Sequence, residues 1–524
     1  MTATAPRLTA PTGAADGELT HRQKMTIISG LLLGIFLAAV DGTIVSTALP
    51  TIAGELGHFD RLTWVVTAYF LTSTATTPLF GKVSDLYGRR IVFQFAIVTF
   101  LAASVLAGLA QTMNQLVLFR GLQGIGGGGM QALAFVILGD ILSPRERGRY
   151  MGLFTGTFAL SGLAGPLLGG LVVDSGSLGW RWIFYLNLPL GLVTFAVITA
   201  VMRFPIRKVQ HAIDWLGAGL LVGAVSCLLI GASLGGGKFP WSSPLIVGLF
   251  AASLVLGVLT VKQEKRAAEP VLPMRLFSND VFSWAMAMAF VAGGAFTTLN
   301  VFLPLFLQIV TGSTATRSGL LLAPMMLGLT VTSIIAGQVL SKTGRYRALI
   351  RSGPFVILAG LGGISMLSVS SKPWHATPWM LVCGIGMGLM MPPLSIAVQN
   401  AVDYTDLGVA TSANTFFRTL GQTCSVAGFG AVMAARLRTE LALRIPAEKL
   451  AALDVKTLTG SPRQIKALPA DLRIPVVASI AHGVHAVFLG AIPLAVLTVF
   501  LAWRIREIPL KSRSGLAQAA AAAE

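Results

Sequence analysis

The chain has 524 residues, of which 54% are hydrophobic and only 11% are charged, and its mean hydropathy is +0.76. About a quarter of the residues of a soluble protein are charged, so this composition excludes a soluble enzyme and predicts an integral membrane protein. The formal net charge of +18 does not indicate nucleic-acid binding, because most lysines and arginines lie in short segments between apolar runs.

Fourteen apolar runs are long enough to cross a membrane as helices, which takes about 20 residues each. They occupy residues 26–50, 62–80, 91–110, 115–139, 151–173, 182–202, 214–234, 244–261, 281–310, 318–340, 352–371, 377–400, 409–435 and 476–503. Basic residues gather in alternate connecting segments, as the positive-inside rule requires when both termini are cytoplasmic. The sequence therefore predicts an all-α, multi-pass membrane protein with 14 transmembrane helices, whose basic loops contact anionic lipid.

The first run carries a carboxylate, Asp41, in "FLAAVDGTIVSTALP". Residues 1–24 before it are polar and lack an apolar core, which predicts a disordered cytoplasmic tail rather than a signal peptide. A charge in lipid costs at least a few kcal/mol unless it faces protein or water. Burial disfavours the charged form of a carboxyl, so we expect Asp41 to bind and release a proton. The alternative is a carboxylate neutralised by a structural partner.

The segment "GKVSDLYGRR", residues 81–90, connects the second and third runs. Gly81 and Gly88 permit tight turns and close approach of backbones. Asp85 has the spacing to cap a helix or to pair with Arg89 or Arg90. We expect these five residues to form a cytoplasmic gate, and a basic anchor loop is the alternative.

The fourth run contains Arg120 in "LVLFRGLQGIGGGGMQ". Its Gly124, Gly126 and Gly129 match a dinucleotide-binding pattern, but they follow no strand and no ribose-binding acid is near, so we reject that fold. The sequence also lacks a phosphate-binding loop, which argues against an ATP-driven pump. Arg120 stays protonated and needs a partner, and we expect it to take part in proton coupling. Pairing with backbone carbonyls is the alternative.

The fifth run contains "SGLAGPLLGG", in which Ser161, Gly165 and Gly169 share one helix face. Small residues at this spacing let a neighbouring helix approach closely, and Pro166 bends the helix. We expect Gly165, Pro166, Gly169 and Gly170 to form a conformational hinge, with plain packing as the alternative.

Other polar residues lie within later runs and are candidates for a substrate cavity. Simple bonding between helices explains each of them equally well. The cysteines lack metal-ligand spacing, so neither a metal nor a cofactor is expected. The candidate cavity residues are Asn187, Asn300, Gln308, Asn414 and Arg418.

Two pairs of similar segments indicate an internal duplication. "GKVSDLYGRR" at 81–90 resembles "GQVLSKTGRY" at 337–346, and "GIGGGGM" at 124–130 resembles "GIGMGLM" at 384–390. The two members of each pair are separated by nearly the same number of residues, which favours a repeat. A duplicated bundle is typical of transporters. We expect two six-helix bundles joined by an inserted pair of helices.

These assignments divide the chain into five parts. The boundaries are a tail at 1–24, an N-terminal bundle at 25–203, the inserted helices with their linkers at 204–279, a C-terminal bundle at 280–505 with an outer loop at 436–475, and a second tail at 506–524.

Taken together, the motifs resemble the major facilitator superfamily, specifically its fourteen-span drug:proton antiporter branch (the EmrB/QacA-like exporters). "VDGTIVSTALP" resembles the branch's first-span motif, "GKVSDLYGRR" the superfamily loop, "RGLQGIGGGG" the span-four motif and "SGLAGPLLGG" the antiporter motif. The chain departs from the branch at Ser46 and Thr47, where Asn-Val is common, and at Ser341, which stands where the first loop has Asp85.

The resemblance implies a proton-coupled exporter of lipophilic, often cationic drugs that works by alternating access in the bacterial cytoplasmic (inner) membrane. Its partners would be a small-molecule substrate, protons and membrane lipids, and a monomer is the expected functional unit. An exporter of a defined endogenous lipid, siderophore or antibiotic fits the same motifs. A non-transporting sensor or scaffold on this fold is a rival of another class.

Overall fold

The computed structural model describes residues 20–56, 61–174, 179–202, 214–236, 239–313, 315–368, 371–448, 465 and 468–511. These ranges are helical apart from turns, short irregular segments and one isolated bridge between Gly235 and Phe239. The α-helices are α1 His21–Leu56, α2 Leu62–Tyr87, α3 Arg89–Gly108, α4 Met113–Ile141, α5 Pro144–Asp174, α6 Trp182–Tyr185, α7 Asn187–Val201, α8 Trp215–Leu234, α9 Pro244–Glu264, α10 Asp280–Ile309, α11 Ala315–Thr343, α12 Arg347–Ser365, α13 Thr377–Asn400, α14 Leu407–Arg444 and α18 Ala470–Arg504. Short 3₁₀ turns cover η3 Met274–Ser278, η4 Pro373–His375 and η5 Tyr404–Asp406.

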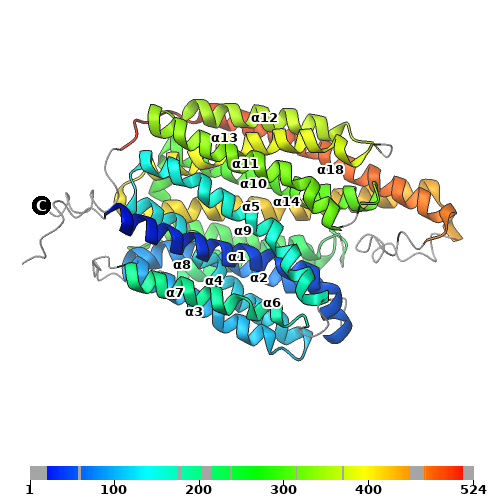
Figure 1. The fold of residues 1–524 in the computed structure, drawn as a ribbon, viewed down its shortest axis with the longest axis horizontal. Coiled ribbons are helices and arrows are strands. Elements are labelled where there is room, and N and C mark those ends of the chain that lie inside the picture. Colours follow the sequence, from blue (N-terminus) through cyan, green and yellow to red (C-terminus); the bar gives the residue numbers. More distant parts are fainter. Residues whose placement is uncertain are drawn as a thin grey trace, which may run out of the picture.

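The long helices run roughly along one axis and pack in two groups (Figure 1). Helices α1–α5 and α7 contact one another, and so do α10–α14 and α18. The groups meet where α5 packs on α11 and where α14 packs on α2 and α4. Helices α8 and α9 form a pair that reaches both groups through α2 and α14.

Twelve helices of the described residues are long and apolar enough to cross a membrane, so the predicted count of fourteen is not confirmed. The two remaining long helices are α2 and α14, which carry many Ser and Thr residues and, in α14, Asn414 and Arg418. Their polarity has a structural reason, since α2 and α14 pack on each other between the two groups. Side chains at such a position face protein rather than lipid.

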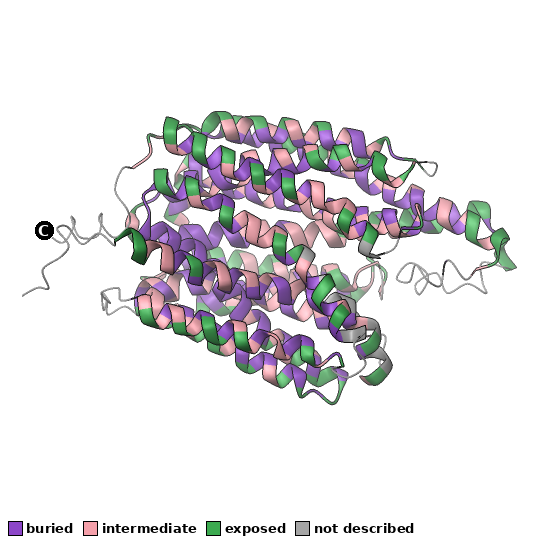
Figure 2. Cartoon of the chain, in the orientation of Figure 1, coloured by how far each residue is buried: buried purple, intermediate pink, exposed green. Residues whose placement is uncertain are grey.

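The outside of the bundle is apolar. Large side chains such as Leu171 (71% exposed), Leu254 (70%) and Leu327 (62%) lie on its surface, and Figure 2 shows exposed residues along the outer helices around a buried interior. A soluble monomer rarely exposes so much contiguous apolar surface, whereas lipid covers it without cost. This surface agrees with a multi-pass membrane protein.

Both ends of the described chain lie at one end of the bundle, and α14 and α18 project from the other (Figure 1). The thirteenth predicted span ended at residue 435, but α14 continues to Arg444. Within this extension Glu440 pairs with Arg436 at 2.9 Å and with Arg444 at 2.8 Å, and such i, i+4 pairs stabilise a helix. Much of the predicted loop 436–475, most of both tails and the linker at 203–213 lie outside the described residues.

Candidate functional site

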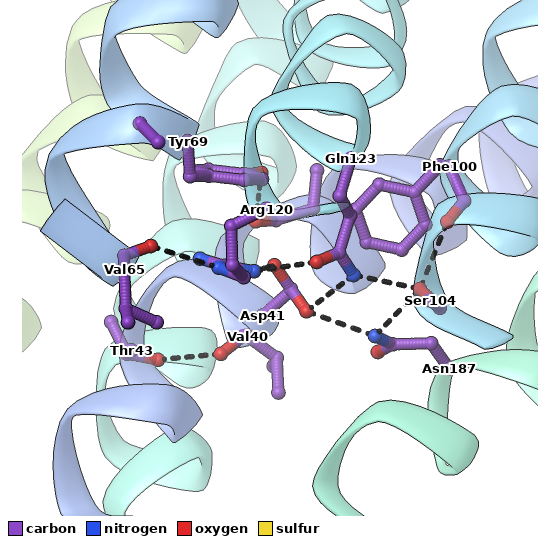
Figure 3. Close-up of polar contacts among 12 residues, drawn as sticks. Val40, Asp41, Thr43, Val65, Tyr69, Phe100, Ser104, Arg120, Gln123 and Asn187 are labelled. Atoms are coloured by element: carbon purple, nitrogen blue, oxygen red, sulfur yellow. Dashed lines mark hydrogen bonds and ion pairs between the residues drawn. The ribbon is translucent and has the colours of Figure 1, made fainter. Parts of the chain in front are cut away.

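Asp41 and Arg120 form a fully buried ion pair between α1 and α4 (Figure 3). Nη1 of Arg120 lies 2.5 Å from Oδ2 of Asp41, and neither side chain is exposed. The sequence singled out both residues as charges in apolar runs, but it gave no means of showing that they touch. The structure brings them together.

Two amide side chains complete the coordination of the Asp41 carboxylate. Oδ1 of Asp41 accepts hydrogen bonds from Nε2 of Gln123 and from Nδ2 of Asn187, each at 2.9 Å. The Ser104 hydroxyl accepts from the same two amides, at 2.7 and 3.3 Å, and donates to the backbone oxygen of Phe100. Helices α1, α3, α4 and α7 thus meet at one polar cluster (Figure 3), which we call the Asp41 cluster: Asp41, Ser104, Arg120, Gln123 and Asn187.

Sequence reasoning placed Asn187 in a substrate cavity and missed Gln123 and Ser104. A signal for Gln123 was present, since it follows Arg120 by three residues and so lies on the same face of α4. No comparable signal marks Ser104, which is an ordinary serine in an apolar helix.

Helix α2 supports Arg120 on its other side. Nε of Arg120 donates to the backbone oxygen of Val65 on α2 at 3.2 Å, and the guanidinium carbon of Arg120 lies 4.4 Å from the centre of the Tyr69 ring on the same helix. The Tyr69 hydroxyl donates to the backbone oxygen of Ala38 on α1. Nη2 of Arg120 is buried and has no hydrogen-bond partner among the described residues. Two other helices, α1 and α2, therefore hold the arginine, while one of its donors stays unused.

This arrangement ties the charge of Asp41 to the packing of four helices. Three donors point at the carboxylate, one each from Arg120, Gln123 and Asn187. A proton on Asp41 would remove the charge that compensates Arg120, and an uncompensated buried charge is strongly destabilising. Arg120 therefore depends on the Asp41 carboxylate for its counter-charge.

A second polar cluster closes the end of the bundle where α2 ends. Arg89 pairs with Asp85, donates from Nε to Oδ2 of Asp140 at 2.8 Å, and donates from Nη1 to the Ser84 hydroxyl at 2.6 Å. Asp140 lies on α4, so the same helix carries Arg120 and a partner of this end cluster. Arg90, which the sequence assigned to the gate, makes no ion pair within the described part of the chain.

Asp85 lies beyond the apolar stretch 62–80, and its environment changes its proton affinity. Burial raises the pKa of the Asp85 carboxyl to about 6, although Arg89 opposes the shift. Asp140 adds to the rise because it places a second negative charge nearby.

Glycines let α14 pack directly on the second polar cluster, which consists of Ser84, Asp85, Arg89 and Asp140. A Cβ atom on Gly81 would lie 2.1 Å from the Ser412 hydroxyl and 2.8 Å from the backbone oxygen of Gly408. A Cβ on Gly408 would lie 2.4 Å from Oδ1 of Asp85. Gly88 has φ +91°, which L-residues rarely adopt. At this end the two helix groups are in tight contact.

The predicted hinge residues of α5 do not share a single environment. A Cβ on Gly165 would lie 2.0 Å from the Thr43 hydroxyl, so this part of α5 packs on α1 within its own group. Gly169 is buried, a Cβ on Gly170 would meet nothing within 4 Å, and Pro166 has a side chain outside the described set. The hinge role of these residues stays a prediction.

The closest contact of α5 with the other group uses glycines that the hinge prediction left out. A Cβ on Gly337 of α11 would lie 1.7 Å from the backbone oxygen of Gly148, and one on Gly152 would lie 2.2 Å from the Ile334 side chain. Buried Arg147 adds a polar link between the groups, because its Nη1 donates to Oε1 of Gln399 on α13 at 2.7 Å.

The remaining candidate cavity residues behave differently from one another. Asn300 donates to the backbone oxygen of Phe296 at 3.1 Å, and Gln308 donates to the Ser318 hydroxyl at 3.0 Å, so both are held by local bonds. Oδ1 of Asn414 accepts from the Ser395 hydroxyl at 3.3 Å. The Arg418 guanidinium lies 5.9 Å from the centre of the Phe135 ring.

Comparisons with known proteins agree with these features. The sequence profile of the major facilitator superfamily matches residues 31–210 and 196–425. The chain belongs to the major facilitator superfamily. This superfamily member is therefore a multi-pass membrane transporter rather than an enzyme, and the family resemblance of its motifs is confirmed.

Relatives and solved structures of similar proteins add detail. The chain is 40% identical to the multidrug transporter protein MdtP of Bacillus subtilis over 422 residues (80% of this chain, 77% of the relative), and 38% identical to multidrug resistance protein 3 of the same organism over 415 residues (79% and 80%). The structure of the human organic anion transporter MFSD10 matches with a TM-score of 0.63, covers 91% of this chain and 99% of its own, and is 15% identical, which supports the fold alone.

Proposed function

We propose that this protein is a proton-coupled exporter of lipophilic small molecules. The observation that carries the proposal is the Asp41 cluster, in which a buried carboxylate is held by Arg120, Gln123 and Asn187. Relatives named as multidrug transporters make drug export the first activity to test, and the family resemblance adds cationic drugs as the first compounds.

Alternating access supplies the mechanism. The contacts of Gly81 with Ser412 and of Gly337 with Gly148 close one end of the bundle. We assign this end to the cytoplasmic side because its loops are basic, and in this proposal the closed end corresponds to a state that faces outward. In this state a proton from outside reaches Asp41 and releases Arg120. Release of Arg120 lets α4 move, and this movement reaches Arg89 through Asp140 on the same helix. The cytoplasmic end then opens.

All fourteen long helices cross the bacterial cytoplasmic membrane in this proposal, including α2 and α14. These two helices border the substrate path, which accounts for their polar residues. The N-terminal bundle at 25–203 and the C-terminal bundle at 280–505 rock against each other, and the monomer carries the whole path.

Gradient-driven uptake tests the proposal. Purified protein in liposomes is given an imposed pH gradient, and the uptake of a fluorescent lipophilic cation is followed for the wild type, for Asp41→Asn and for Asp280→Asn. Asp280 is a matched control because it is an exposed acid at the start of α10. We expect gradient-dependent uptake by the wild type and by the control, and none by Asp41→Asn. Equal uptake by all three would remove Asp41 from proton coupling.

A further inference from the structure

A row of polar side chains on α14 is left with unused hydrogen-bonding groups. Asn414, Arg418 and Gln422 are spaced by four residues, so they share one helix face. Nδ2 of Asn414 is buried and unpaired, and neither Arg418 nor Gln422 makes a hydrogen bond or an ion pair within the part of the chain that the structure describes. We call these three residues the α14 row.

Arg418 stands out because a guanidinium inside a membrane protein needs a partner. It follows the first residue of α14, Leu407, by eleven positions, or about 16 Å of helix. An unpaired cation at such depth is expensive and marks a functional site. Arg120, which also lies deep in the bundle, has its carboxylate at 2.5 Å. No carboxylate of the described residues lies within ion-pair distance of Arg418, so none of them supplies its counter-ion.

The surroundings of Arg418 indicate that a ligand between the two helix groups would reach its guanidinium. A Cβ on Gly293 of α10 would lie 2.5 Å from the backbone oxygen of Arg418, so α10 covers the backbone of α14 here. The start of the Arg418 side chain also packs near Gly293, and its guanidinium carbon lies 5.9 Å from the centre of the Phe135 ring, on α4 of the opposite helix group. Arg418 keeps part of its surface accessible at this boundary, which is where transporters of duplicated architecture bind their substrates.

The neighbouring rings indicate the rest of the ligand. Phe135 on α4 places an aromatic ring beside the guanidinium, and the fully buried Phe154 packs behind it with 5.5 Å between ring centres. A guanidinium fork matches a carboxylate with two parallel hydrogen bonds, and aromatic faces favour a flat ring. The amides of Asn414 and Gln422 offer further donors one turn to either side.

We propose that the α14 row, with Phe135, binds the carboxylate end of an aromatic acid carried as substrate. This inference rests on the proposed transport function, since it names a class of substrate for the same path. It extends the proposed substrates from cations to anions, because the positive charge at the boundary between the helix groups is that of Arg418 itself.

Direct binding tests this inference without a pH gradient. The probes are dansylglycine, a fluorescent aromatic acid, and dansylglycinamide, its uncharged counterpart, measured by fluorescence polarisation with the protein in lipid nanodiscs. The variants are Arg418→Gln, Arg418→Lys and Arg436→Gln. Arg436 is the matched control because it is an arginine of the same helix, five turns away and half exposed.

We expect the wild type and Arg436→Gln to bind the acid about tenfold more tightly than the amide, a typical effect of a charge-assisted hydrogen bond. Arg418→Gln should lose this preference while it still binds the amide, which shows that the variant is folded. Arg418→Lys should keep part of the preference because the charge remains.

Two results would overturn the inference: equal affinity of the wild type for acid and amide, or an unchanged preference in Arg418→Gln. Failure of the proposed transport function looks different. In that case the acid preference depends on Arg418, but no compound moves in liposomes under a pH gradient.

Discussion

Removing one member of the Asp41–Arg120 pair should destabilise the protein more than removing both. Asp41→Asn keeps the shape of the side chain but leaves Arg120 buried without a counter-charge, in contact with the Tyr69 ring and the Val65 carbonyl. Breaking a buried pair in this way costs about 3–5 kcal/mol. Arg120→Gln leaves the Asp41 carboxylate with only Gln123 and Asn187 as donors, and we expect a loss of similar size.

The double variant Asp41→Asn/Arg120→Gln contains no uncompensated charge. Replacing a buried ion pair by neutral groups is often nearly neutral for stability, so we expect the double variant to be more stable than either single variant. The coupling energy should be at least about 2 kcal/mol in favour of the pair. An SDS titration of unfolding measures these free energies, with a thiol-reactive dye as the probe, because Cys383 is buried and free.

The reasoning fails if the losses of the two single variants simply add in the double variant. Additivity would mean that Arg120 does not depend on Asp41 for its counter-charge. The reasoning also fails if Asp41→Asn unfolds at the same SDS concentration as the wild type, since the carboxylate would then contribute no net stability.

Three further predictions concern the closed end. Gly81→Ala should push α2 away from Ser412 and lengthen the spin-label distance between the ends of α2 and α14, whereas Gly162→Ala, with open space at its Cβ, should leave it unchanged. Gln399→Leu should favour opening of this end and so lengthen the same spin-label distance, because buried Arg147 loses its acceptor on α13. Asp85 has its pKa raised to about 6 in the closed state, against about 3.9 in water, so the closed state binds the proton more tightly. Lowering the pH from 7 to 5 should therefore favour closure by about 1 kcal/mol, and Asp85→Asn should abolish this pH dependence of the spin-label distance.

The fold was predictable from the sequence because apolar runs and basic loops report on lipid directly. Asp41 and Arg120 were found for a related reason, since a charge in an apolar run is costly enough to indicate function. Their contact was not predictable, because it depends on how α1 and α4 pack across 79 positions of chain. The same holds for Asp140, which joins Arg89 only through the packing of α3 and α4.

The count of spans shows a limit of another kind. Hydropathy describes what a helix needs in lipid, but α2 and α14 face protein on several sides. Their polar residues lower the apolar signal, and composition alone does not separate such a helix from a helix outside the membrane. Gly148 and Gly152 illustrate a similar limit, because the sequence does not say which neighbour a small-residue face contacts.

Proton movement triggered by substrate tests the central claim most directly. The protein is placed in liposomes that contain a pH-sensitive dye, with no imposed gradient, and a lipophilic cation is added outside. Antiport predicts that the cation enters and protons leave, so the interior becomes alkaline with the wild type, while Asp41→Asn and the Asp41→Asn/Arg120→Gln variant give no pH change. An interior pH that stays constant while the wild type takes up the cation would contradict proton coupling at the Asp41 cluster.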